Sequence, residues 1–255
     1  MNKPSADTLS KVPEITLGFW VIKIAATTLG ETGGDEVSMS LNLGYALSSI
    51  IFIGIFLLAV ATQIRAKSFH SLLYWFVIVA TTTAGTTMAD FADRSLGIGY
   101  PGGSILLFAL LMASLALWYR STGSISVQTV TTPRVEIFYW VSILFSQTLG
   151  TALGDWVADS GLGYEGGALV FAAALAVVVA LYFLTSVSRT ALFWTAFILT
   201  RPLGATVGDF LDKPVAGGGL AVSRLYASLL IAAFMIICIL IFPQRSGRHP
   251  GDTPA

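Results

Sequence analysis

One spacing pattern recurs four times along the chain and constrains its fold more than any other feature. A tryptophan is followed ten residues later by a glycine, and five residues after that glycine comes an aspartate. The pattern W-x9-G-x3-[GA]-D starts, without one insertion, at Trp20, Trp75, Trp140 and Trp194, at intervals of 55, 65 and 54 residues. Chance does not maintain three positions in four copies, so the chain contains four tandem repeats of one structural unit.

The composition places these repeats in a membrane. Of the 255 residues, 55% are hydrophobic and only 11% are charged, whereas a soluble domain has about 25% charged residues. A helix needs about 20 mostly apolar residues to cross the hydrocarbon layer. Eight segments meet this requirement, at about residues 15–35, 43–63, 71–91, 98–119, 136–156, 165–185, 190–210 and 222–242.

The sequence therefore predicts an all-α polytopic membrane protein with eight transmembrane helices. They form four two-helix repeats, at about residues 15–65, 71–120, 135–187 and 190–243. Because each repeat holds an even number of spans, all four repeats point the same way through the membrane and are parallel, not inverted. A fourfold ring and a two-plus-two pairing of the repeats are both compatible with this pattern.

The distribution of basic residues predicts the orientation of the membrane domain, residues 14–243. Nine lysines and arginines fall on one side of the eight-span layout, and the opposite loops hold only Arg94 and Lys213. The positive-inside rule therefore predicts a multi-pass protein of the bacterial inner membrane with both termini in the cytoplasm. The tails, residues 1–13 and 244–255, are polar and contain several prolines, so we expect them to be disordered.

Three repeats begin their second helix with a Gly-Tyr pair, whereas the fourth reads Gly218-Gly219-Leu220. The pairs are Gly44-Tyr45, Gly99-Tyr100 and Gly163-Tyr164. Together with the spaced Trp, Gly and Asp, these residues make the chain similar to a family of bacterial inner-membrane proteins. That family consists of four tandem two-helix repeats, each with a characteristic tryptophan, and is defined as a repeat of unknown function. The resemblance covers roughly residues 15–242; it implies eight membrane helices and supplies no activity or catalytic residues.

The first helix of each repeat carries one polar stripe, because residues four apart share a helix face. Stepping back from the four aspartates gives Lys23, Thr27, Glu31 and Asp35; Thr82, Thr86 and Asp90; Gln147, Thr151 and Asp155; and Arg201 and Asp209. With a rise of about 1.5 Å per residue, each aspartate lies about 22 Å beyond its tryptophan. A charge at the centre of a lone membrane helix costs about 2.5–3.5 kcal/mol, so the stripes should face one another or a wet cavity.

Small residues and aromatic residues have their own predicted places. The glycines Gly30, Gly34, Gly85, Gly150, Gly154, Gly204 and Gly208 lie on a face adjacent to the stripe and form small-xxx-small pairs. Such pairs allow close helix packing; a break in the helix that bares carbonyls to a cation is the alternative. An aromatic belt would place the four tryptophans at the cytoplasmic membrane interface. We expect Asp93, Asp159 and Asp212 to be solvated in the outer loops.

The available ligands restrict the chemistry of a site on the stripes. Cys238 is the only cysteine, and His70 and His249 lie away from the stripes, so soft metals are disfavoured. Carboxylate and threonine oxygens suit hard cations such as Mg²⁺, Mn²⁺, Ca²⁺, Na⁺ or H⁺. The candidate cation-binding residues are the five stripe carboxylates: Glu31, Asp35, Asp90, Asp155 and Asp209. Lys23 and Arg201 are expected either to pair with Glu31 or a neighbouring carboxylate, or to compete with the cation.

Two functions from different classes follow. The first is a transporter of a small hard cation, a divalent metal or a proton- or sodium-coupled solute, through a polar cavity lined by the first helices. The second is a structural or interaction protein whose stripes only pack helices. Hydrolase, zinc-protease, Walker and dinucleotide motifs are missing from the sequence, so we expect no enzyme, no catalytic residues and no cofactor. The charges cancel, with 14 basic and 14 acidic residues; this favours lipid and not nucleic acid as the partner.

Overall fold

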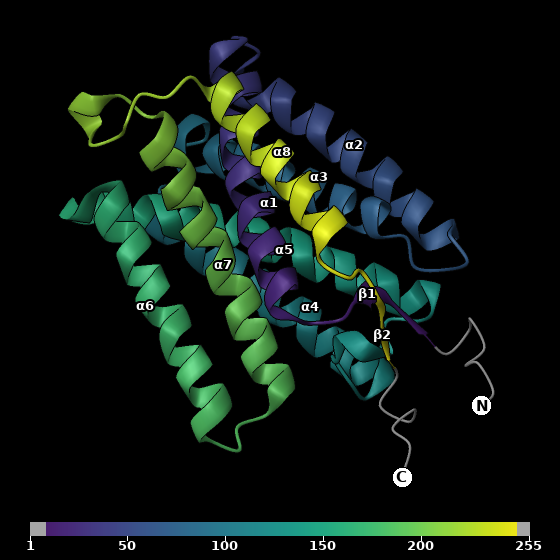
Figure 1. The fold of residues 1–255 in the computed structure, drawn as a ribbon. Coiled ribbons are helices and arrows are strands. Elements are labelled where there is room, and N and C mark those ends of the chain that lie inside the picture. The colour runs from purple at the N-terminus through teal and green to yellow at the C-terminus, as the bar shows by residue number, and fades with distance from the viewer. Residues whose placement is uncertain (1–8, 249–255) are drawn as a thin grey trace.

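The computed structural model describes residues 9–248, and eight long α-helices run through this part of the chain (Figure 1). The first helices of the repeats are α1 (Leu17–Asp35), α3 (Ser71–Asp90), α5 (Pro133–Val157) and α7 (Arg189–Asp212). The second helices are α2 (Gly44–Arg65), α4 (Tyr100–Thr122), α6 (Gly163–Leu184) and α8 (Arg224–Ile241).

The four first helices form a closed ring, in which α1 packs on α3, α3 on α5, α5 on α7, and α7 on α1. Of the two arrangements that the repeats allow, the structure has the fourfold ring. Each second helix lies outside the ring and packs on the first helix of the next repeat: α2 on α3, α4 on α5, α6 on α7 and α8 on α1. No repeat is therefore a self-contained hairpin, because each second helix is covered by the following unit.

Five stretches of the described chain are long and apolar enough to cross a membrane. They are Gly44–Arg65, Ser71–Ser95, Tyr100–Thr122, Pro133–Leu184 and Arg224–Ile241, the fourth of which runs through both α5 and α6. These stretches are compatible with a membrane protein. Helices α1 and α7 are not among them, and both carry charged stripe residues that point into the ring: Lys23, Glu31, Asp35, Arg201 and Asp209.

The first three repeats turn from the first helix to the second in the same way. Each first helix continues into a π-helical turn, η2 (Glu36–Ser40), η3 (Phe91–Ser95) or η5 (Ala158–Leu162). The glycine of the Gly-Tyr pair then adopts a positive φ: 72° at Gly44, 75° at Gly99 and 66° at Gly163. Since this left-handed conformation favours glycine, the pair marks the start of each outer helix. The fourth repeat departs from this geometry and uses a 3₁₀ turn, η6 (Val215–Gly217).

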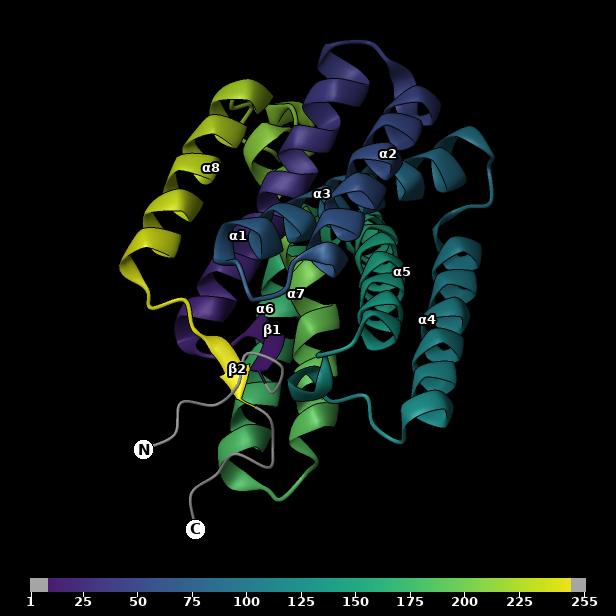
Figure 2. The same cartoon turned by 90° about the vertical axis from the view of Figure 1, so that its right-hand side faces the viewer.

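The two ends of the described chain meet. Strand β1 (Leu9–Pro13) pairs antiparallel with β2 (Ser246–Arg248) (Figure 2), and the 3₁₀ turn η4 (Val127–Thr129) lies against them. Lys11 Nζ forms an ion pair of 2.7 Å with Glu136 Oε1 on α5. The expectation of disorder is therefore wrong for residues 9–13 and 246–248, because each strand finds its hydrogen-bond partners at the far end of the sequence. Tail residues 1–8 and 249–255, with His249, lie outside the described part.

The repeat tryptophans belong to the interior of the ring. Trp75, Trp140 and Trp194 are buried, and Trp20 is half-buried. The residue before each tryptophan is also aromatic and buried: Phe19, Tyr74, Tyr139 and Phe193. Edge and tilted ring contacts join them into an aromatic layer across one end of the ring. The tryptophans therefore pack against neighbouring helices at one end of the ring, and their expected place at the cytoplasmic interface stays a prediction.

Candidate functional site

Glycines set the spacing between neighbouring ring helices in a cyclic pattern. A Cβ at Gly30 on α1 would overlap Thr82 on α3, and one at Gly204 on α7 would overlap Thr27 on α1. Gly85 and Gly150 make the equivalent close approaches to Gln147 on α5 and to Arg201 on α7. Each glycine thus meets the polar stripe of the next helix. All four ring helices run unbroken through these glycines, so the alternative of a broken helix that bares its carbonyls is wrong.

A second set of small residues extends the same packing one turn further along the helices. Cβ atoms at Gly34, Gly154 and Gly208 would lie 3.1, 3.1 and 2.8 Å from Thr86, Ala205 and Glu31 respectively. The stripes are therefore turned into the ring, where every stripe residue named in the sequence analysis is buried.

Arg201 lies at the centre of the ring and contacts the three other ring helices. Its Nη2 donates to Glu31 Oε2 on α1 at 2.9 Å, to Thr86 Oγ1 on α3 at 2.6 Å and to Thr151 Oγ1 on α5 at 2.5 Å. The arginine side chain is fully buried. Of the two basic residues on the stripes, Arg201 makes the expected pair with Glu31. Lys23 does not; its ammonium lies over the ring of Phe197.

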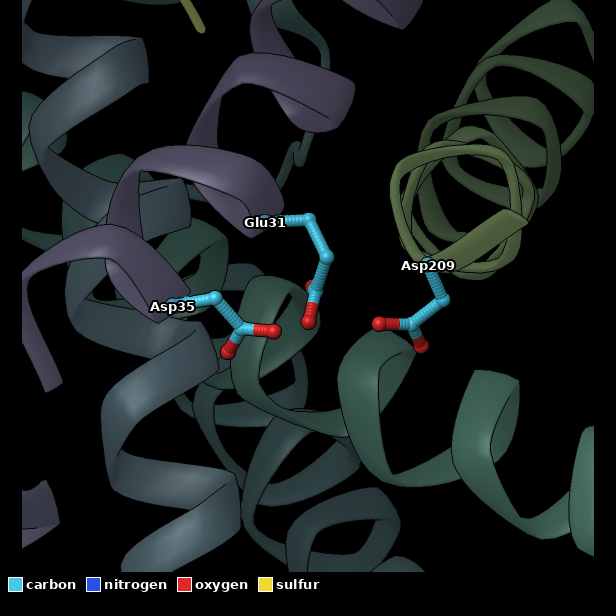
Figure 3. Close-up of side chains that lie close together, drawn as sticks. All are labelled: Glu31, Asp35 and Asp209. Atoms are coloured by element: carbon cyan, nitrogen blue, oxygen red, sulfur yellow. The ribbon is translucent and has the colours of Figure 1, made fainter. Parts of the chain in front are cut away.

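Three of the five candidate carboxylates come together on the α1–α7 side of the ring. Glu31, Asp35 and Asp209 each offer an oxygen, and these oxygens lie within 4.8 Å of one another. Figure 3 shows the three carboxyl groups pointing toward a common space, two from α1 and one from α7. All three are buried. Carboxylate oxygens at this separation form a donor set that a hard divalent cation accepts.

Two bases neutralise part of this cluster. Lys213 Nζ bridges Asp35 and Asp209, and it lies 3.0 Å from Asp209 Oδ1. Burial opposes the charge of Lys213, but the neighbouring carboxylates of Asp209 and Asp35 raise its pKa above the ordinary lysine value. Arg224 Nε lies farther away, at 3.9 Å from Asp35 Oδ2. The ammonium group of Lys213 therefore occupies the position between Asp35 and Asp209.

The other two candidate carboxylates form a separate pair on the α3–α5 side. Arg94 bridges them, with Nε 2.9 Å from Asp90 Oδ1 and Nη2 3.1 Å from Asp155 Oδ2. The Arg94 side chain is 38% exposed, whereas that of Lys213 is 9% exposed. The five carboxylates thus form two groups, one bridged by the buried Lys213 and one bridged by the partly exposed Arg94.

Arg94 and Lys213 are functional candidates that the stripe pattern did not include, because they lie beyond the ends of the predicted stripes. A signal for them exists in the sequence. Each base stands four residues after the aspartate of its repeat, Asp90 or Asp209, and so lies on the same helix face. In the first and third repeats this position holds Met39 and Asp159. A base at this position therefore occurs only in the second and fourth repeats.

Of the three carboxylates expected in solvated loops, only Asp159 is exposed. Asp93 and Asp212 are buried, so the prediction is wrong for these two. Asp212 accepts a hydrogen bond of 3.2 Å from Arg224 Nε. Asp93 lies against Gly103 at the start of α4. Both are drawn inward because the π-turn after α3 and the last turn of α7 fold back onto the outer helices.

A comparison with protein families identifies the repeat. The family described as Repeat of Unknown Function (DUF347) matches residues 18–69, 73–124, 138–188 and 192–246. The chain belongs to the DUF347 family. Its four tandem matches each cover one first helix and the second helix that follows it. The curated proteins and the solved structures contain no match to the chain.

Proposed function

We propose that this DUF347 protein crosses a bacterial inner membrane eight times, with both termini in the cytoplasm. The outer helices support this, because they present long apolar side chains on the outside of the ring, such as Leu58, Leu106 and Leu229 with exposed fractions of 72%, 52% and 57%. Apolar surface of this extent belongs in lipid. The polar stripes of α1 and α7, which are too charged to face lipid, are covered by other helices. In this orientation the aromatic layer is cytoplasmic and the aspartates face outward.

Within that frame we propose a transporter of a small, hard divalent cation. The observation that carries the proposal is the buried group of Glu31, Asp35 and Asp209, whose oxygens lie within 4.8 Å of one another. Lys213 occupies this group as an internal cation. With Lys213 and Arg201 in place, and with Arg224 paired with Asp212, the three carboxylates retain one unit of negative charge. A divalent cation that displaced Lys213 would neutralise the group, whereas a monovalent cation would leave it charged.

The proposed transport has an order of steps. On this proposal the cation enters at the aspartate end, where Arg94 is partly exposed, because the aromatic layer fills the opposite end. A cation therefore reaches Asp35 and Asp209 first, as Lys213 swings away, and then Glu31. Passage further inward requires the Arg201–Glu31 ion pair to separate, because Arg201 fills the centre of the ring. Transfer of a proton to Glu31 would release Arg201 and couple the two movements.

A structural role is the second candidate, and the close packing favours it. The stripe residues interlock with glycines of the neighbouring helix all around the ring. On this alternative the stripes only hold helices together, and replacing an aspartate with asparagine lowers the thermal stability without any cation-dependent effect.

The transporter and the structural role can be distinguished by the uptake of Mn²⁺ into proteoliposomes that contain a dye quenched by Mn²⁺. The informative variant is Asp209→Asn, and the matched control is Glu165→Gln, an exposed carboxylate of α6. We expect wild type and the control to quench the dye, and Asp209→Asn to lose most of the uptake while it elutes as a folded protein. Equal uptake by all three proteins, or none by wild type, would contradict the transporter.

A further inference from the structure

The half of the ring between the aromatic layer and Glu31 contains a buried lysine without a carboxylate partner. Lys23 on α1 has an exposed fraction of 0%. Its Nζ donates one long hydrogen bond of 3.5 Å to Thr200 Oγ1 and lies 4.2 Å from the centre of the Phe197 ring. Among the described residues, no carboxylate lies within ion-pair distance of this ammonium.

Arg201, the residue after Thr200, adds donors to the same region. Only its Nη2 is used, by Glu31, Thr86 and Thr151. Its Nε and Nη1 are buried and find no acceptor in the described part of the chain. Of these two bases Glu31 contacts only Arg201, so Lys23 has no carboxylate partner in this half of the ring.

Gln147 contributes a third unused group. It holds on α5 the stripe position that Arg201 holds on α7, eight residues before the aspartate, and so it lies on the ring-facing side of its helix. Its exposed fraction is 0%, and neither amide atom has a partner within residues 9–248. The fourfold-equivalent threonines, Thr27 and Thr82, direct their hydroxyls to backbone carbonyls instead.

These groups share one requirement. Each is a buried donor group that lacks sufficient hydrogen-bond acceptors: the Lys23 ammonium, two N–H groups of the Arg201 guanidinium and the Gln147 amide. Burial of such groups in an apolar interior lowers the stability of the fold unless an acceptor is present. A buried charge also needs a partner of opposite sign. The carboxylates of the aspartate layer do not provide it, because Lys213 and Arg94 bridge them.

We propose that this half of the ring binds one small monovalent anion of the halide type. Its ligands are Lys23 Nζ, the free N–H groups of Arg201 and the Gln147 amide. A single-atom anion fits better than an oxyanion, since the glycine contacts hold the four helices close together and the walls are apolar, with Phe197, Ile78 and Ile143 fully buried. The anion site shares Arg201 with the proposed cation path, whereas its other two ligands, Lys23 and Gln147, take no part in that path.

Halide replacement in the purified, detergent-solubilised protein tests this site. We expect the melting temperature to rise with added chloride or bromide, relative to gluconate at the same ionic strength. Lys23→Met should abolish the halide dependence, and Lys23→Arg should retain it. Lys11→Met is the matched control, because Lys11 is paired with Glu136 at the aromatic end, and it should keep the full halide response.

Crystals of the wild-type protein grown in bromide give a second measurement that does not depend on any variant folding. We expect an anomalous bromide peak inside the ring between Lys23 and Arg201. A melting temperature that is indifferent to halide, an equal halide response in Lys23→Met, or no anomalous peak within the ring would each overturn the proposal. In that case Lys23 would be a neutral amine, which needs no bound anion.

Discussion

The two sides of the ring start from the same design and differ in what lies between their aspartates. On the α3–α5 side, Arg94 bridges Asp90 and Asp155 and remains 38% exposed. On the α1–α7 side, Lys213 bridges Asp35 and Asp209, is 9% exposed, and is joined by Glu31. The repeat therefore supplies a symmetric scaffold, and a few charged replacements turn one side into a closed, three-carboxylate group.

The largest effect should come from Arg201→Met. It removes the base paired with Glu31, and breaking a buried ion pair from one side costs about 3–5 kcal/mol. The free energy of unfolding in detergent should fall by that amount. The double variant Arg201→Met/Glu31→Gln should recover much of the loss, because no uncompensated charge remains; a double variant as unstable as the single one would contradict the assignment.

Removing the two bridging bases compares the sides directly. Lys213→Met leaves two buried carboxylates facing each other, and we expect a loss of about 3 kcal/mol. Arg94→Met also leaves two buried carboxylates, but water can reach the place of the 38% exposed Arg94 side chain, so we expect a smaller loss of about 1–2 kcal/mol. Chemical unfolding of both variants measures the difference, and equal losses would show that the two sites do not differ in burial.

Glycine substitutions test the shared scaffold. A Cβ at Gly85 would lie 2.9 Å from the backbone of Gln147, and one at Gly204 would lie 2.9 Å from the backbone of Thr27. Gly85→Ala and Gly204→Ala should therefore cost about 1–3 kcal/mol each through overpacking. The control is Gly54→Ala on α2, where nothing lies within 4 Å of the added Cβ; it should be neutral or stabilising. Unequal costs at Gly85 and Gly204 would show that the scaffold is not symmetric.

The smallest effect belongs to the aromatic layer. Tyr74 and Tyr139 share a hydrogen bond of 2.7 Å between their hydroxyls, whereas the equivalent residues on the other side are Phe19 and Phe193. Tyr74→Phe should lower the free energy of unfolding by about 1 kcal/mol. The matched change Phe19→Tyr would bury a new hydroxyl and should lower the free energy of unfolding more than Tyr74→Phe does. A larger loss for Tyr74→Phe than for Phe19→Tyr would contradict the difference between the two sides of the ring.

Much of the inner face of the ring could be predicted from sequence, because it follows from local spacing. The fourfold interval from tryptophan to aspartate places Glu31, Asp35 and Asp209 on stripes, and helix periodicity turns those stripes inward. The glycine positions follow from the same spacing, since they lie one residue from the stripe.

What sequence reasoning missed depends on contacts between repeats. These contacts join residues that are distant in the chain. They are the packing of each outer helix on the next repeat, including that of α8 on α1, and the pairing of β1 with β2. The burial of the tryptophans was missed for the same reason, since the spacing gives their depth along the helix and not the helix that covers them. Lys213 lies in a short loop after α7, and only the fold shows that it returns to Asp35.

The meeting of β1 and β2 makes the order of the repeats cyclic. Because α8 lies on α1 as α2 lies on α3, the ring has no unique first unit. A circular permutant that joins residues 9 and 248 through a short linker and opens at residues 66–70, between α2 and α3, should retain every helix pair of the ring. The packing of the helices therefore does not depend on which repeat comes first in the chain.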